Sequence, residues 1–237
     1  MVKVMLFFFF SGFRVLKTKK IYFDFNSTVT NSGNNSSKYY YVQPEISILP
    51  LYNLKFSASL NYSNNFDNLQ YIDTKPVNNE NRYILGKIKQ QTLGVTFRID
   101  YNITPELSIQ YYGSPFASVG KYSDFKKVTN PKAGSYAERY SLLNPVQNGN
   151  DYDVSENNNP VYNYSFANPN FNFYQFRSNL VVRWEYSPGS QIYIVWSQDR
   201  TDYIQPGYFS VNRSLSNLKN VYPNNIFLIK YNYWFTI

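Results

Sequence analysis

The sequence predicts an all-β protein: an antiparallel transmembrane β-barrel, or the C-terminal part of one, with about 8–9 strands in this chain. Apolar and polar residues alternate with a period of two along most of the 237 residues. Aromatic residues make up 20% of the chain and charged residues only 16%, against about 25% charged residues in a typical soluble domain. Mean hydropathy is nevertheless negative, at -0.46, and no apolar run approaches the ~20 residues that a membrane helix needs. This combination is typical of strands that face lipid on alternate residues.

The first nineteen residues allow two interpretations. Lys3 precedes a short apolar stretch, as in a secretory signal. However, Arg14 follows closely, and no pair of small residues marks a cleavage site. Residues 1–19 are therefore expected to be either a strand, over 4–16, or the truncated start of an exported protein. The barrel region is predicted to cover 20–237.

Three hairpins follow, each made of two alternating segments joined by a tight turn. The segments KYYYVQPEISILP and NLKFSASLNYS meet near 50–53. QTLGVTFRIDYN and LSIQYY are joined by Thr104-Pro105-Glu106. FRSNLVVRWEY and SQIYIVWSQDR are joined by Ser-Pro-Gly-Ser at 187–190. A further tight turn is expected at 17–20.

Long polar connections are predicted between these hairpins, at 31–37, 74–82, 121–170 and 202–224. Transmembrane barrels have short periplasmic turns and longer extracellular loops, so 121–170 is predicted to be a long extracellular loop. If the tight turns are periplasmic, the strand count brings the C-terminus into the periplasm as well. The final segment, NIFLIKYNYWFTI, is predicted to be the closing strand and the assembly signal of the barrel.

Alternation assigns a side of the barrel to each strand residue. Aromatic residues near the strand ends, among them Trp184, Trp196 and Tyr231, are expected to lie at the membrane interfaces. The residues predicted to face the lumen are Arg98, Asp100, Arg177, Arg183 and Glu185. Those predicted to face lipid are Leu93, Val95, Phe97, Ile99, Leu180, Val182, Trp184, Phe227, Ile229, Tyr231, Tyr233 and Phe235.

No catalytic residue, cofactor site or metal site is predicted, and the protein is expected not to be an enzyme. The chain has no Cys and no His, which excludes thiol nucleophiles, disulfides, Cys/His metal sites and His-based triads. Asp151, Asp153 and Glu156 could form a Ca²⁺ site or an acid/base pair, but a solvated loop is the favoured interpretation. Arg183 and Glu185 could set the lumen charge, although an internal salt-bridge lattice is favoured. The net charge of +8 comes from scattered Lys and Arg, so nucleic acid is not an expected partner.

Two longer motifs carry a family resemblance. FRSNLVVRWEYSPGSQIYIVWSQDR (176–200) and YYGSPFASVGKYSDFKKV (111–128) resemble segments of the bacterial domain of unknown function 5916 family. NLQYIDT (68–74) and the ending NIFLIKYNYWF also fit this family. The resemblance implies an outer-membrane protein of Bacteroidetes-like bacteria. Such proteins usually carry an upstream domain similar to family-9 carbohydrate-binding modules, which is not recognisable in this sequence, so no sugar-binding role is carried over.

The expected function is that of a non-catalytic outer-membrane barrel, serving as a scaffold or as a channel or uptake component with a link to glycan handling. The bacterial outer membrane is the expected location. Outer-membrane lipid, the barrel-assembly machinery (through the C-terminal strand) and a glycan are the expected partners. The alternative is a soluble secreted β-sandwich that binds carbohydrate on an aromatic surface. The substrate, the strand number of the intact barrel and its partner subunits are left open.

Overall fold

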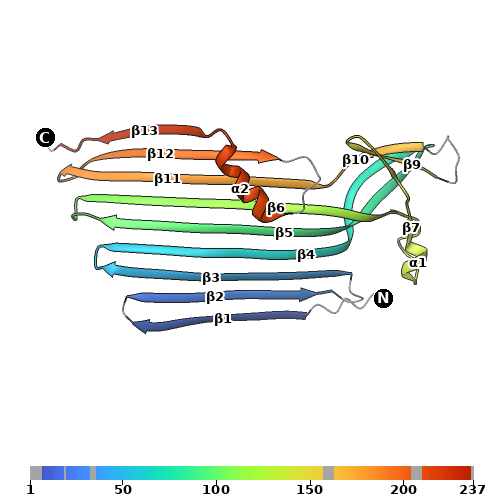
Figure 1. Ribbon diagram of the computed structural model, residues 1–237, viewed down its shortest axis with the longest axis horizontal. Coiled ribbons are helices and arrows are strands. Elements are labelled where there is room, and N and C mark those ends of the chain that lie inside the picture. The colour runs from blue at the N-terminus through green and yellow to red at the C-terminus, as the bar shows by residue number, and fades with distance from the viewer. Residues whose placement is uncertain (1–6, 19, 33–35, 157–162, 204–209, 236–237) are drawn as a thin grey trace.

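The computed structural model describes residues 7–18, 20–32, 36–156, 163–203 and 210–235, and most of them lie in one broad antiparallel sheet (Figure 1). This main sheet is 10-stranded, and a second sheet is 3-stranded. The all-β, antiparallel fold class is therefore confirmed. In spatial order the main sheet comprises β1 (Phe7–Thr18), β2 (Ile21–Asn31), β3 (Ser37–Leu51), β4 (Leu54–Val77), β5 (Glu80–Asn102), β6 (Leu107–Val128), β11 (Phe171–Ser187), β12 (Ser190–Tyr203) and β13 (Asn224–Asn232), while β7 (Tyr140–Leu142) pairs with β6.

The main sheet is open over the residues that the structure describes. β1 and β13 are its two edges, and no pairing joins them. Among the described residues, no helix is long and apolar enough to cross a membrane. The final strand ends at Asn232, so the predicted strand over 225–237 is too long. Residues 236–237 lie outside the described part.

The tight turns predicted at 50–53, 103–106 and 187–190 are present, and Lys19 of the fourth is not described. The long connection predicted at 74–82 is wrong. β4 and β5 run through this segment and are joined by Asn78 and Asn79 alone. Both residues have a positive φ, 48° and 63°, as a two-residue type I′ hairpin requires and as Asn tolerates. The polar residues that resembled a loop are the ends of two long strands, which are exposed over 78–81.

The segment 121–170 is also more ordered than predicted. β6 continues to Val128, and α1 (Tyr136–Arg139) precedes β7. β8 (Val146–Asn148), β9 (Asp151–Ser155) and β10 (Asn163–Ala167) then form the small sheet, in the order β10-β9-β8. These short strands bring the chain above the predicted 8–9. The connection at 202–224 contains α2 (Val211–Asn217) and the 3₁₀ helix η3 (Leu218–Asn220).

Two clusters supply the buried apolar core. The first lies where the small sheet meets the ends of β5 and β6, and contains Ile84, Phe125, Leu143, Val154 and Phe166. The second lies where α2 and η3 pack on β6 and β11, and contains Ala117, Val119, Tyr174, Val211 and Leu218. Most of the main sheet contributes to neither cluster. The fold thus buries its apolar residues locally and leaves wide areas of the sheet open.

Gly113 of β6 lies under the ring of Phe97, and a Cβ there would be 2.3 Å from the ring Cζ. We expect Gly113→Ala to displace this ring and lower the free energy of unfolding by about 1–3 kcal/mol, as overpacking does, measured by chemical denaturation. Nothing lies within 4 Å of a Cβ on Gly134, so Gly134→Ala should leave stability unchanged or slightly higher. Equal losses in the two variants would show that the packing on Gly113 is not tight.

Candidate functional site

Cross-strand pairing places the residues predicted to face lipid on one side of the main sheet. Directly paired residues share a face. Ile99 of β5 pairs with Tyr111 of β6, which pairs with Leu180 of β11. Leu180 pairs with Trp196, and Trp196 pairs with Phe227 of β13. The same register and the alternation along each strand join Leu93, Val95, Phe97, Val182, Trp184, Ile229 and Tyr231 to this side, which we call the apolar face.

The five residues predicted to face the lumen share the opposite side, which we call the polar face. Arg98 pairs with Tyr112, and Tyr112 with Asn179. Arg177 on the same strand as Asn179 pairs with Asp199, and Asp100 lies two positions from Arg98. Arg183 and Glu185 follow Asn179 by even steps. What covers each face stays a prediction, and Tyr233 and Phe235 lie beyond the end of β13, both exposed.

A polar hollow of about 410 Å³ lies on the polar face over β3, β4 and β5. Its charged side chains balance, with two cations and two carboxylates. Arg98 lies 5.1 Å from the ring centre of Tyr112. In the described part of the chain, no ion pair joins the four charged groups to one another. The lining residues are Gln43, Glu45, Lys55, Ser57, Ser59, Asn61, Thr96, Arg98 and Asp100.

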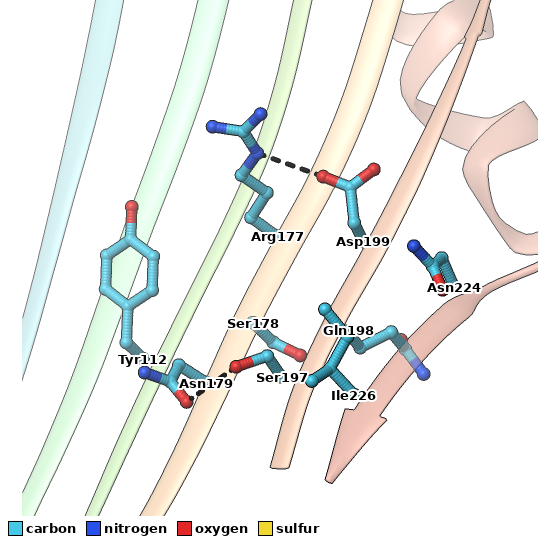
Figure 2. A pocket seen from close by; sticks show the side chains of 9 residues that line it. All are labelled: Tyr112, Arg177, Ser178, Asn179, Ser197, Gln198, Asp199, Asn224 and Ile226. Carbon is cyan, nitrogen blue, oxygen red and sulfur yellow. Dashed lines mark hydrogen bonds and ion pairs between the residues drawn. The ribbon is translucent and has the colours of Figure 1, made fainter. Parts of the chain in front are cut away.

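A second hollow, of about 320 Å³, lies between β6 and β13 (Figure 2). Arg177 lines it and donates from Nε to Oδ2 of Asp199 at 2.9 Å (Figure 2). Ser197 donates its hydroxyl to Oδ1 of Asn179 at 3.2 Å. These contacts hold side chains of β11 and β12 together, but they pair no nucleophile with a base. Within the described residues, no group of three or more Asp or Glu could hold a metal ion.

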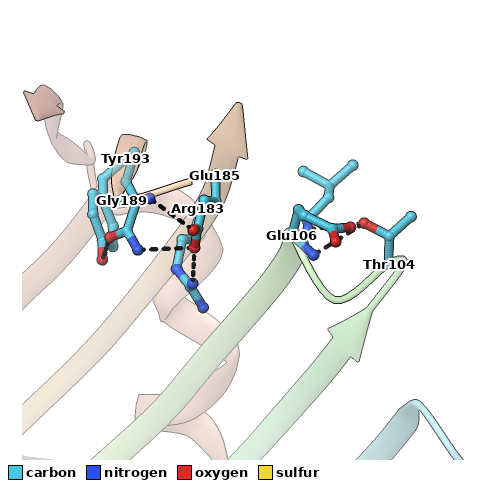
Figure 3. Close-up of polar contacts among 8 residues, drawn as sticks. Thr104, Glu106, Arg183, Glu185, Gly189 and Tyr193 are labelled. Atoms are coloured by element: carbon cyan, nitrogen blue, oxygen red, sulfur yellow. Dashed lines mark hydrogen bonds and ion pairs between the residues drawn. The ribbon is translucent and has the colours of Figure 1, made fainter. Parts of the chain in front are cut away.

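A polar network connects the ends of β11 and β12 beside the turn at 187–190 (Figure 3). Glu185 accepts from Arg183 Nη2 at 3.1 Å, from Gln191 Nε2 at 3.2 Å and from the backbone N–H of Gly189 at 3.1 Å. Tyr193 donates its hydroxyl to Gln191 at 2.7 Å. The ion pair of the expected salt-bridge lattice is therefore present. Its contacts stay within the β11–β12 hairpin.

The expectation that Asp151, Asp153 and Glu156 lie in a solvated loop is wrong for Glu156. Its side chain is only 5% exposed and accepts hydrogen bonds from Lys127 Nζ and from the Tyr164 hydroxyl, at 3.0 Å for the latter. Arg82 Nε lies 3.4 Å away. Burial alone would raise the pKa of Glu156, but the hydrogen bonds from Lys127 and Tyr164, with the charges of Lys127 and Arg82, outweigh it and lower that pKa.

The three acidic residues of this segment do not form a common site. Asp151 and Asp153 are exposed, whereas Glu156 is buried. In β9 the buried Val154 and half-buried Tyr152 alternate with these exposed aspartates, and Glu156 follows in the same phase as Val154. This period of two is the signal in the sequence that could have located Glu156 on the buried side. Neither its cationic partners nor the packing of the small sheet follows from that pattern.

The position of α2 was also not predicted. The helix lies across the main sheet (Figure 1) and packs on a cluster that includes Ala117 and Leu93, on the apolar face. Arg200 Nη1 donates to the carbonyls of Leu218, Lys219 and Val221 at 3.3–3.4 Å. Leu93, predicted to face lipid, is therefore partly covered by the protein itself.

Comparison with known proteins gives one match. The family model described as "Domain of unknown function (DUF5916)" matches residues 8–236, nearly the whole chain. No curated protein and no solved structure matches the chain.

Proposed function

The chain belongs to the DUF5916 family, and from the geometry of its two faces we propose that it forms part of a β-barrel in a bacterial outer membrane. The apolar face contacts lipid, and the polar face lines the interior. The role is non-catalytic, as an envelope scaffold or as a channel or uptake component. Lipid is the main partner, and the C-terminal strand engages the barrel-assembly machinery.

The accessible surface area is the observation that carries this proposal. A folded soluble monomer of 27.9 kDa is expected to expose roughly 11,000 Å², whereas this chain exposes 15639 Å². On the apolar face, Phe227 and Ile229 are 74% and 75% exposed. Soluble monomers rarely expose contiguous apolar patches beyond a few hundred Å². Lipid is a solvent that would cover the part of this face that α2 and η3 leave exposed.

The aromatic residues and the connections support a membrane orientation. Tyr186 and Tyr231 stack at 5.7 Å and share a hydrogen bond of 2.7 Å between their hydroxyls, near the tight-turn end of the sheet. Tyr and Trp favour such interfacial positions. The tight turns at 50–53, 103–106 and 187–190 and the C-terminal end of β13 lie at the same end of the main sheet (Figure 1), consistent with a periplasmic end. The two-residue turn Asn78–Asn79 lies at the opposite end of β4 and β5. Trp196 differs from its prediction, because it lies in the middle of β12 rather than at a strand end.

The balanced charge of the 410 Å³ hollow favours uncharged polar solutes over ions. The 410 Å³ hollow combines two cations and two carboxylates with hydroxyl and amide groups. The Tyr41 hydroxyl lies within hydrogen-bonding distance of two side-chain carbonyl oxygens, Gln43 Oε1 at 2.9 Å and Asn61 Oδ1 at 3.0 Å, and donates its single proton to one of them at a time. A glycan, rich in hydroxyl groups, is the class of solute that such a lining would suit.

Expression with a signal peptide tests the membrane proposal. We expect the chain to fractionate with the outer membrane and to change its SDS-PAGE mobility on heating, because folded barrels resist SDS until heated. Flotation of the purified protein with lipid vesicles provides a second readout. Recovery as a freely soluble periplasmic protein, without detergent, would contradict the proposal.

A soluble secreted β-sandwich that binds carbohydrate is the second candidate. The packing of α2 and η3 on the apolar face favours it, because a soluble protein must cover that face with its own chain. α2 leaves β13 and β3 uncovered, however: Phe227, Ile229 and Ile46 remain exposed. Carbohydrate binding by a detergent-free monomer would favour this candidate.

A further inference from the structure

β13 is an edge strand whose outer side is unpaired in the described part of the molecule. β12 pairs with one side of it through a continuous register from Gln191–Asn232 to Asp199–Asn224. All residues over 224–231 are exposed, and Lys230 is the only charged one. A long, apolar edge of this kind readily pairs with another strand, and natural proteins usually protect such edges with charges, Pro or bulges. β13 shows little of this protection.

Apolar residues lie on both faces of β13, not only on the apolar face. Ile226 pairs with Ser197 and Leu228 with Val195, which places both on the polar face. They are 59% and 53% exposed. A neighbouring strand on the outer side would cover these side chains from the flank. The exposure of both faces therefore indicates a missing lateral neighbour.

The other edge strand, β1, runs in the wrong direction to be that neighbour. Each strand of the path from β1 to β13 pairs antiparallel with the next, and the path contains eight such pairings. An even number of reversals leaves β1 and β13 parallel, as the arrowheads in Figure 1 show. Single-chain barrels of the bacterial outer membrane are antiparallel with an even number of strands. Antiparallel closure therefore needs an odd number of further strands between β13 and β1.

A second copy of the chain cannot supply the antiparallel strand beside β13 in a membrane. Antiparallel pairing of β13 with its symmetry mate needs a two-fold axis perpendicular to the strands. Because barrel strands cross the bilayer, this axis would insert one copy upside down. This step rests on the proposed membrane location.

We infer that the free edge of β13 accepts an antiparallel amphipathic strand from a polypeptide segment outside the described sheet. The strand continues the apolar face beside Phe227, Ile229 and Tyr231. It also places apolar side chains beside Ile226 and Leu228 on the other face. Main-chain hydrogen bonds supply the affinity, and the side-chain pattern supplies the register, as in other cases of strand addition.

Hydrogen exchange on the purified full chain in detergent micelles tests the inference. The probe is a synthetic peptide with the sequence of β12, SQIYIVWSQDRTDY (190–203), because β12 is an amphipathic strand that already pairs antiparallel with β13. The control peptide has the same composition without the alternation. We expect saturable slowing, by roughly tenfold, of the β13 amides that point away from β12, with the alternating peptide only.

Crosslinking determines the direction of the added strand and tests whether a second copy of the chain supplies it. The chain has no Cys, so Leu228→Cys introduces a single thiol on β13. Peptides with one Cys near either end should crosslink in the order that an antiparallel register requires. Three results would overturn the inference: no protection by the alternating peptide, protection of both sides of β13 in the monomer without peptide, or efficient disulfide-linked dimers of the Leu228→Cys variant.

Vesicle flotation of the same sample separates this inference from the membrane proposal. If β13 captures the peptide but the protein does not float with vesicles, the membrane proposal fails and the strand-accepting edge stands. If the protein floats but the peptide gives no protection, the edge inference fails alone.

Discussion

Phe97→Arg should lower the free energy of unfolding in lipid vesicles by about 2–4 kcal/mol, the cost of a cation on the lipid face of a barrel near the bilayer midplane. Phe97 lies within β5 on the apolar face, with its ring over Gly113 and 5.7 Å from the ring of Tyr111. The substitution removes this packing and, under the proposed membrane location, puts a charge into lipid. Urea titration of the refolded protein measures the loss.

Thr96→Arg is the matched control, because Thr96 is the neighbouring residue on the polar face and lines the 410 Å³ hollow. An Arg there extends into a polar space, so its effect should be much smaller. Phe97→Gln separates the loss of packing from the cost of the charge. Equal losses for Phe97→Arg and Thr96→Arg would refute the assignment of the two faces to lipid and lumen.

Glu156→Gln should destabilise the docking of the small sheet on β5 and β6 by about 3 kcal/mol. Loss of one partner from a buried ion pair typically costs about 3–5 kcal/mol, and the low end applies because Lys127 and Arg82 keep some contact with water. The amide leaves Lys127 without its carboxylate and weakens the bond from Tyr164. Limited proteolysis between 129 and 170 and hydrogen exchange of β9 measure the loss. Asp151 occupies an exposed position of β9. Asp151→Asn should therefore change the free energy of docking, measured in either way, by less than about 0.5 kcal/mol.

The contacts of the Glu156 carboxylate also predict that the stability of the small sheet falls at acidic pH. The pKa of Glu156 is lower in the folded protein than its ordinary value. Its contribution is therefore complete above about pH 4.3, the ordinary pKa of a Glu carboxyl, and is lost as the pH falls through the lowered pKa. Protease sensitivity of the small sheet should rise on acidification in the wild type and change less in Glu156→Gln. An identical acid response in both proteins would assign the effect to other carboxylates.

The local sequence pattern predicted the strands well. Side chains of a strand alternate between two faces with a period of two, so a segment of a few residues is enough to show the pattern. Leu180, Val182 and Trp184 could be assigned to one face, and Arg183 and Glu185 to the other, from this repeat alone. Turn residues located the hairpins, such as Pro188, whose ring fixes φ, and Gly189, which adopts a φ of 78°. The family membership was likewise recognisable in the short motifs at 111–128 and 176–200. The segment 74–82 was misassigned because exposed strand ends are as polar as a loop.

What the sequence by itself determined is the all-β class, the period of two, most of the hairpins and the two faces, since all of these depend on neighbours within one hairpin. The tertiary structure alone decided which distant segments meet. It brought Arg82 and Lys127 to Glu156, packed α2 on the apolar face, and set β1 and β13 as the parallel edges of the main sheet over the described residues. These contacts join residues far apart in the chain, and no local period encodes them. Their energies come from burial and pairing that exist only once the strands are assembled.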